Sequence, residues 1–334
     1  MSKIVRLIAA ALACATAAGA QAQKLNGAGA TFPNPIYSKW FSEYSASHPG
    51  VQINYQSIGS GGGIRQVTAG TVDFGASDGP MTDEQLAASK VRIQHIPTVL
   101  GAVVPVYNLP GVGQLHFAPD VLADIYLGKV SNWSDPRLAK DNPGVKFPNQ
   151  EIAIVHRSDG SGTSYIFTDY LSKISPAWAN GPGRGTAPNW PKGIGAKGNE
   201  GVAGFVRQLP GSIGYVELIY ALQNKIPFGA IRNPAGTWVT ASIEGVTAAA
   251  ASIRQLPPDY RVSITNAPGK DAYPISSFTW LLVPNPAKDP ANGKVLVDFL
   301  RWMLQHEDEA TSLCYAPLPA SVAKRVSATV DTLK

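Results

Sequence analysis

The run of residues 157–164 (RSDGSGTS) has residue types and spacing that suit a small oxyanion. The Arg157 guanidinium can donate two parallel hydrogen bonds to such an anion. Asp159 can hold that guanidinium in place and offset part of its charge. The next residues bring hydroxyls and backbone N–H groups to the expected start of a helix, namely Ser161, Gly162 and Thr163. The run therefore predicts an anion site, with a capped turn carrying a surface ion pair as the alternative.

Two further segments rich in Gly, Ser and Thr stand where an apolar strand gives way to a helical pattern: residues 27–33 (GAGATFP) and 59–63 (GSGGG). Thr31 and Ser60 supply hydroxyls there, and the backbone N–H of Phe32 lies at a helix start. The glycines permit close approach of the backbone to a ligand. Three such loops indicate an anion held mostly by neutral donors. Taken singly, Thr31 and Ser60 could be simple helix N-caps.

Strand and helix signals alternate along the chain, as in α/β folds. Helices are expected at residues 34–47, 64–69, 119–127, 163–173, 202–208 and 293–309. Another helix is expected to begin at Thr82, which can form a capping box with Gln85. Strands are expected at residues 51–55, 71–78, 96–109, 152–156, 212–216 and 274–283. Residues 192–201 are expected to form a loop, and residues 227–271 to be mostly loops.

Two of the expected strands, residues 96–109 and 274–283, are long and apolar and flank the central block of the chain. Used as connectors, they predict one lobe built from both chain ends and a second lobe built from the middle. A site between two such lobes would close by a hinge motion. Asp78 ends the strand at residues 71–78 and would face that site, unless it is only a turn residue.

Composition places the chain among folded globular proteins. It has 334 residues, of which 44% are hydrophobic and 15% charged, enough for one large or two medium domains. The formal net charge is +5. Scattered charge of this size does not indicate a nucleic-acid surface, which needs clustered Lys and Arg.

The first residues predict a secretory signal peptide at residues 1–22: two basic residues, a short apolar stretch and an A-x-A end. Cleavage is expected after Ala22, with Ala20 as the alternative, and acylation at Cys14 is a third possibility. Removal of Cys14 leaves Cys314 alone, so no internal disulfide is expected.

Residues 27–33 (GAGATFP) and 157–164 (RSDGSGTS), together with residues 72–78 (VDFGASD), 124–129 (DIYLGK), 198–201 (GNEG) and 209–216 (LPGSIGYV), resemble the periplasmic phosphate-binding proteins of high-affinity phosphate ABC importers. The resemblance runs from about residue 25 almost to the C-terminus. It implies an α/β fold of the type II periplasmic-binding-protein class, with two α/β lobes, two crossover strands and the ligand in the cleft. It implies lobe I at residues 23–105 and 276–334, and lobe II at residues 106–275.

Carried over by position, the resemblance implies phosphate contacts from Thr31, Phe32, Ser60, Asp78, Arg157, Ser161, Gly162 and Thr163, with Asp159 supporting Arg157. Family members often have GSSGG where this chain has GSGGG, so help from a second serine hydroxyl is not expected. A buried carboxylate beside an anion is costly unless the ligand carries a proton. Asp78 would then accept a hydrogen bond from phosphate and reject unprotonated sulfate, by a factor of roughly 10⁴ to 10⁵.

The implied protein is a non-catalytic, monomeric periplasmic receptor. Its implied partners are inorganic phosphate and the permease and ATPase subunits of the transporter, without nucleic acid, metal or cofactor. A hydrolase is the rival class, but neither Ser60 nor Ser161 stands in a G-x-S-x-G motif. Another tetrahedral anion is the third alternative; Asp78 argues against sulfate and does not discriminate against arsenate.

Overall fold

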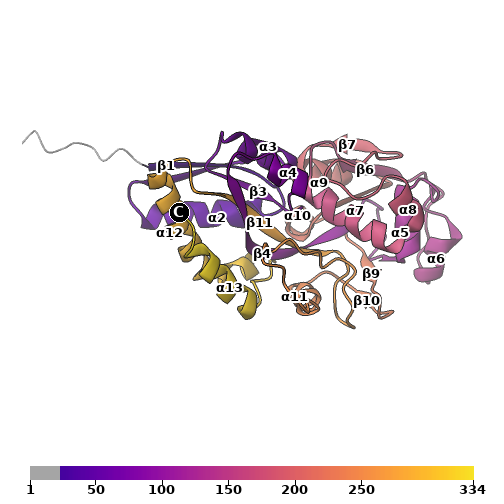
Figure 1. Ribbon diagram of the computed structural model, residues 1–334. Coiled ribbons are helices and arrows are strands. Elements are labelled where there is room, and N and C mark those ends of the chain that lie inside the picture. Colours follow the sequence, from indigo (N-terminus) through magenta and orange to yellow (C-terminus); the bar gives the residue numbers. More distant parts are fainter. Residues whose placement is uncertain (1–22) are drawn as a thin grey trace, which may run out of the picture.

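The computed structural model describes residues 23–334 and has an eight-stranded mixed sheet as its centre (Figure 1). In spatial order its strands are β2 (Val51–Ser57), β1 (Gln23–Gly29), β3 (Phe74–Ser77), β11 (Ser276–Asn285), β4 (Arg92–Tyr107), β8 (Ser212–Glu217), β6 (Ala153–Arg157) and β7 (Ile194–Ala196). The chain start and the chain end lie on the same side of the molecule in Figure 1, and the middle of the chain forms the other side. The predicted α/β class and its two lobes are confirmed.

Strand β4 joins the two halves of the sheet. Residues 92–102 of β4 pair antiparallel with β11, and residues 103–107 pair antiparallel with β8. Its burial is continuous after Arg92, as expected for a strand covered on both faces. The two long apolar strands predicted as connectors are therefore direct neighbours. The lobe boundaries at residues 105/106 and 275/276 stay a prediction.

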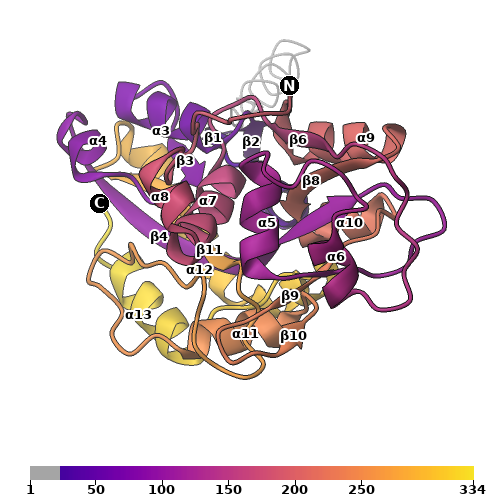
Figure 2. The ribbon, with the colours of Figure 1, turned by 90° about the vertical axis from the view of Figure 1, so that its right-hand side faces the viewer.

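Helices cover both halves of the sheet. Around the chain ends these are α2 (Asn34–Ser47), α3 (Ser60–Ala69), α4 (Asp83–Ala87), α12 (Pro290–Leu304) and α13 (Ala320–Val330), with a 3₁₀ helix at Glu307–Leu313. The other helices are α5 (Pro119–Tyr126), α6 (Pro136–Asp141), α7 (Gly162–Ile174), α8 (Pro176–Asn180), α9 (Gly198–Gln208), α10 (Leu218–Gln223) and α11 (Ile243–Ala251). Helices α5 and α7 pack side by side, as Figure 2 shows. A small sheet joins β10 (Trp238–Val239), β9 (Ala230–Arg232) and β5 (His116–Phe117).

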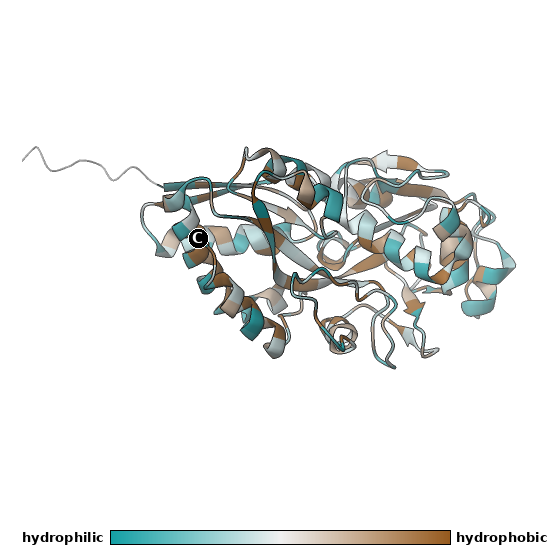
Figure 3. Cartoon of the chain, in the orientation of Figure 1, coloured by the Kyte–Doolittle hydropathy of each residue, from teal (hydrophilic) through white to brown (hydrophobic). Residues whose placement is uncertain are grey.

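Helix α2 forms where its apolar spacing predicts it and starts with a proline in its first turn, where the missing N–H costs nothing. It buries one face against the sheet: Ile36, Tyr37, Trp40, Phe41 and Tyr44. Phe41 lies 5.7 Å from Phe74 of β3 and 5.2 Å from Phe299 of α12, measured between ring centroids. Apolar segments also run along the central strands in Figure 3. This packing holds α2 against the sheet and against α12.

Three local predictions are wrong. Residues 192–201 are not a loop, because they contain β7 and the start of α9. Helix α3 begins at Ser60 rather than at residue 64, and α12 ends at Leu304, five residues before the predicted end. Residues 227–271 hold many loops, as expected, with α11 and two short strands between them. The predicted signal peptide at residues 1–22 lies outside the described residues. Within residues 23–334, no helix combines the length and the apolarity that a membrane span requires.

Candidate functional site

Thr31 and Phe32 lie between β1 and α2, where two tyrosine hydroxyls fix their carbonyl groups. The Tyr220 hydroxyl donates to the Thr31 carbonyl at 2.6 Å. The Tyr315 hydroxyl donates to the Phe32 carbonyl, also at 2.6 Å. In a trans peptide the N–H points away from the preceding carbonyl, so holding the Thr31 carbonyl also aims the Phe32 N–H. The orientation of this donor is thus set by Tyr220.

Ser60 opens α3 and contacts Asp78, which follows β3. The Ser60 hydroxyl accepts from the backbone N–H of Asp78 at 3.1 Å and donates to Asp78 Oδ2 at 3.4 Å. Thr279 of β11 donates its hydroxyl to Asp78 Oδ1 at 2.8 Å. The Asp78 carboxylate is therefore held from two directions and cannot easily turn away.

Arg157 ends β6 and makes a two-pronged ion pair with Asp159. Arg157 Nε lies 2.7 Å from Asp159 Oδ1, and Nη2 lies 2.5 Å from Oδ2. The third nitrogen, Nη1, donates to the Thr163 hydroxyl at 3.3 Å. Ser161 caps α7 by accepting the Ser164 N–H at 2.9 Å. The first N–H groups of α7, including those of Gly162 and Thr163, have no intrahelical acceptor.

The segment around Ser60 and Asp78 contacts the segment that leads into α7. The Gly61 N–H donates to the Gly160 carbonyl at 2.8 Å. Gly162 approaches Ser60 and Asp78 so closely that an added Cβ would lie 2.3 Å from Ser60 Oγ and 2.4 Å from Asp78 Oδ2. All of the predicted contact residues are buried: Thr31, Phe32, Ser60, Asp78, Arg157, Ser161, Gly162 and Thr163. Sequence motifs more than a hundred residues apart thus form one enclosed polar cluster.

Comparisons with known proteins identify the family. The model of the PBP superfamily domain matches residues 15–307. The phosphate-binding protein PstS of Xylella fastidiosa is 47% identical over 309 residues, which are 91% of this chain and 84% of the relative. The PstS of Pasteurella multocida is 45% identical over 312 residues, 92% of this chain and 90% of the relative. The chain belongs to the PstS family.

The fold of this PstS-family chain agrees with that of a solved phosphate-binding protein from Stenotrophomonas maltophilia. The two structures superpose with a TM-score of 0.74, covering 92% of this chain and 93% of the other at 19% identity. At this low identity the likeness concerns the fold. It supports the periplasmic-binding-protein fold of the described residues.

The buried cluster of this PstS-family chain contains one permanent cation but carries little net charge. Burial raises the pKa of Asp78 to about 7, although hydrogen bonds from Thr279 and Ser60 and the charge of Arg157 oppose the shift. Burial also disfavours the charge on Asp159, but the hydrogen bonds and the charge of Arg157 prevail and lower its pKa. Arg157 and Asp159 offset each other. An anion entering the cluster would meet mostly dipoles, namely hydroxyls and helix N–H groups.

Some residues of the cluster were not among the predicted site residues. Thr279 bonds to Asp78, and the Asn199 side chain bonds to both Thr31 and Thr163. Asn199 stands in the GNEG segment that contributed to the resemblance, so a signal was present in the sequence. Thr279 lies in the middle of an apolar strand, and no local pattern marks it.

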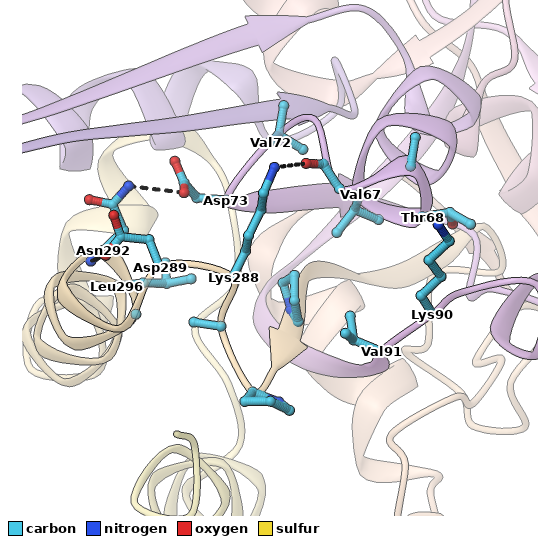
Figure 4. Close-up of a pocket in the computed structure, with 16 residues that line it drawn as sticks. Val67, Thr68, Val72, Asp73, Lys90, Val91, Lys288, Asp289, Asn292 and Leu296 are labelled. Carbon is cyan, nitrogen blue, oxygen red and sulfur yellow. Dashed lines mark hydrogen bonds between the residues drawn. The ribbon is translucent and has the colours of Figure 1, made fainter.

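A separate pocket of about 290 Å³ lies on lobe I between α3, α12 and the segment before β4 (Figure 4). None of the predicted site residues lines it. Two of its polar side chains are already paired: Lys288 Nζ donates to the Gly70 carbonyl at 3.1 Å, and Asn292 Nδ2 donates to Asp73 at 3.0 Å. The pocket is therefore distinct from the buried cluster and offers no comparable set of donors.

Proposed function

We propose that this chain is an exported receptor that binds inorganic phosphate between its two lobes and delivers it to an ABC importer. The names of its relatives support phosphate as the ligand. The observation that carries the proposal is the pairing of a buried acceptor, Asp78, with a helix start and an arginine contributed by the other lobe. Donors alone would suit any oxyanion, whereas an added acceptor suits one that retains a proton.

Each group of the cluster has a role in this proposal. On lobe I, Thr31 contributes its hydroxyl, Phe32 its backbone N–H and Ser60 its hydroxyl, while Asp78 accepts the phosphate proton. On lobe II the ligand is bound by Arg157, Ser161, Gly162 and Thr163. Asp159 stays outside the ligand shell and fixes Arg157 through its two short hydrogen bonds.

The remaining parts of the proposal concern the partners and the compartment. The chain would act as a monomer in the periplasm, after removal of a signal peptide ending near Ala22. The closed form would dock on the membrane permease of the transporter, and the ATPase subunits of that transporter complete the set of partners. Lobe I at residues 23–105 and 276–334 and lobe II at residues 106–275 would open about β4 and β11, the strands that join them. No catalytic step is proposed.

The test is calorimetric titration of the ligand-stripped mature protein with phosphate and then with sulfate, at mildly alkaline pH. Phosphate binding at micromolar concentration or tighter, with much weaker sulfate binding, is the expected result. Equal affinity for both anions would refute the role of Asp78. Absence of binding together with hydrolysis of phosphate esters would favour the hydrolase alternative.

A further inference from the structure

Asn199 is the residue through which the two threonines of the cluster meet. Its side-chain nitrogen Nδ2 lies 2.7 Å from Thr31 Oγ1 on lobe I and 3.0 Å from Thr163 Oγ1 on lobe II. Its backbone N–H also donates to Thr31 Oγ1, at 3.3 Å. Asn199 is fully buried. One amide group therefore spans the cleft at the position where both lobes present hydroxyls.

The orientation of this amide follows from its other end. Asn199 Oδ1 lies 2.9 Å from the backbone N–H of Glu217. A backbone N–H can only donate, so the atom that faces it must be the oxygen of the amide. The two hydrogens of Nδ2 are then directed at the two threonine hydroxyls. Rotating the amide by 180° would place N–H against N–H and would leave both threonines facing an acceptor.

This orientation determines how the threonine protons are used. A hydroxyl has two acceptor positions and one proton to donate. Thr31 Oγ1 accepts twice from Asn199, and Thr163 Oγ1 accepts once from Asn199 and once from Arg157 at 3.3 Å. Both hydroxyls have thereby filled their acceptor positions. The proton of each remains available for a third partner.

We propose that Asn199 is a positioning residue that forces the hydroxyls of Thr31 and Thr163 to donate to the bound anion. The inference rests on the proposed function and deepens it. Asn199 does not touch the ligand in this scheme. Without it, each hydroxyl would be free to rotate and to present a lone pair to the anion, which would weaken binding.

The test is a double-mutant cycle on phosphate affinity. Asn199→Ala is expected to weaken phosphate binding about 10- to 100-fold, the range for orienting hydrogen bonds to a charged group. In a Thr31→Val background there is one hydroxyl fewer to orient. In that background, Asn199→Ala is therefore expected to weaken phosphate binding only by about the square root of the factor that it causes in the wild-type chain. The same is expected in a Thr163→Val background. Titration up to millimolar phosphate keeps all variants measurable.

A residue that only stabilised the fold would weaken binding by the same factor in every background, so equal factors would overturn the proposal. Unchanged affinity in Asn199→Ala would also overturn it. Asn142→Ala is a matched control, because Asn142 is also buried and its Oδ1 also accepts a backbone N–H, that of His116 at 2.7 Å, but it is not part of the cluster. If Asn199→Ala does not fold, Asn199→Leu provides the same cycle with the volume preserved. If the wild-type chain does not bind phosphate, the proposed function fails first and the inference falls with it.

Discussion

Replacement of Asp78 by asparagine tests whether this residue detects the proton of the ligand. The ligand-free Asp78 carboxyl has a pKa of about 7 and is 1% exposed. Sulfate carries no proton near neutral pH, so it can enter only when Asp78 itself is protonated and donates. Above pH 7 this protonation costs about 1.4 kcal/mol for each pH unit. Phosphate keeps one proton throughout this range and needs none from the solvent.

The expected result is that sulfate affinity depends more steeply on pH than phosphate affinity does. Between pH 7 and pH 9, the sulfate affinity of the wild-type chain should fall roughly 50-fold in total, by about tenfold per pH unit in the upper part of the range. Phosphate affinity should stay nearly constant between pH 8 and pH 9. In Asp78→Asn the sulfate affinity should be independent of pH and the phosphate affinity nearly constant between pH 8 and pH 9, because the amide can donate to either anion without titrating. The raised pKa therefore predicts weaker sulfate discrimination at neutral pH than the 10⁴ to 10⁵ of an unpaired buried acceptor.

The assay is calorimetric titration of wild type and Asp78→Asn with each anion at pH 7, 8 and 9 and constant ionic strength. Parallel pH profiles for phosphate and sulfate in the wild-type chain would refute the reasoning. So would a sulfate profile in Asp78→Asn that falls as steeply as that of the wild type. A uniform loss of affinity for both anions in the variant, without a change of slope, would assign Asp78 a purely structural role.

Three further perturbations follow from the same contacts. In the folded, ligand-free chain the Asp78 carboxyl keeps its proton up to about pH 7, whereas in the unfolded chain it releases the proton near pH 4. This group therefore stabilises the fold fully below about pH 4, and the stabilisation is lost as the pH rises to 7. Urea unfolding from pH 4 to pH 8 should show a loss on the order of 4 kcal/mol that is absent in Asp78→Asn. Asp159→Ala leaves Arg157, whose side chain is 1% exposed, without its carboxylate, and should lower the free energy of unfolding by about 3 kcal/mol; an unchanged denaturation midpoint would contradict this. Gly162→Ala should weaken phosphate binding about 10- to 100-fold by blocking closure, whereas Gly204→Ala, whose Cβ would meet nothing within 4 Å, should bind normally.

The parts of the fold that the sequence predicts correctly have local signals. Helix α2 combines a five-residue apolar face with a proline in its first turn. The capping box of α4 forms as predicted, with Thr82 and Gln85 each satisfying the backbone N–H of the other. Strands β4 and β11 are continuous apolar runs, which is the pattern of strands buried on both faces.

The helix starts that were predicted wrongly depend on tertiary contacts. Helix α9 begins in the segment GNEG, whose glycines have low helix propensity. Asn199 is held there by Thr31 and by the Glu217 N–H, and these contacts replace the missing local preference. Helix α3 begins within GSGGG for a related reason. A Cβ at Gly63 would lie 2.6 Å from the Ala28 carbonyl, so the glycine permits an approach to the strand that no propensity scale describes.

In the site, too, some residues have a local sequence signal and others are set by tertiary contacts. The loop motifs identify the residues with hydroxyls, the arginine and the aspartates, because these stand at strand ends where ligands bind. The residues that orient them are remote in sequence. Thr279 lies 201 positions from its partner Asp78, and Asn199 lies 168 positions from Thr31. A single sequence carries no information about such pairings until the sheet order is known.

The fixed position of the Asp78 carboxylate is what makes selectivity possible in a cluster composed mainly of donors. A flexible carboxylate could turn away from an unprotonated anion and bind another donor, and its presence would then discriminate little. Thr279 on β11 and Ser60 on α3 hold the two carboxylate oxygens at 2.8 Å and 3.4 Å. Thr279 lies on β11, which pairs with β3 just before Asp78, so its restraint does not depend on the approach of α7, whereas the single Ser60 proton is given to the ligand in the proposed function. In the proposed function, closure would bring Gly162 and the start of α7 against a carboxylate that is already oriented, and while Asp78 is ionised only an anion that supplies a proton would satisfy both sides.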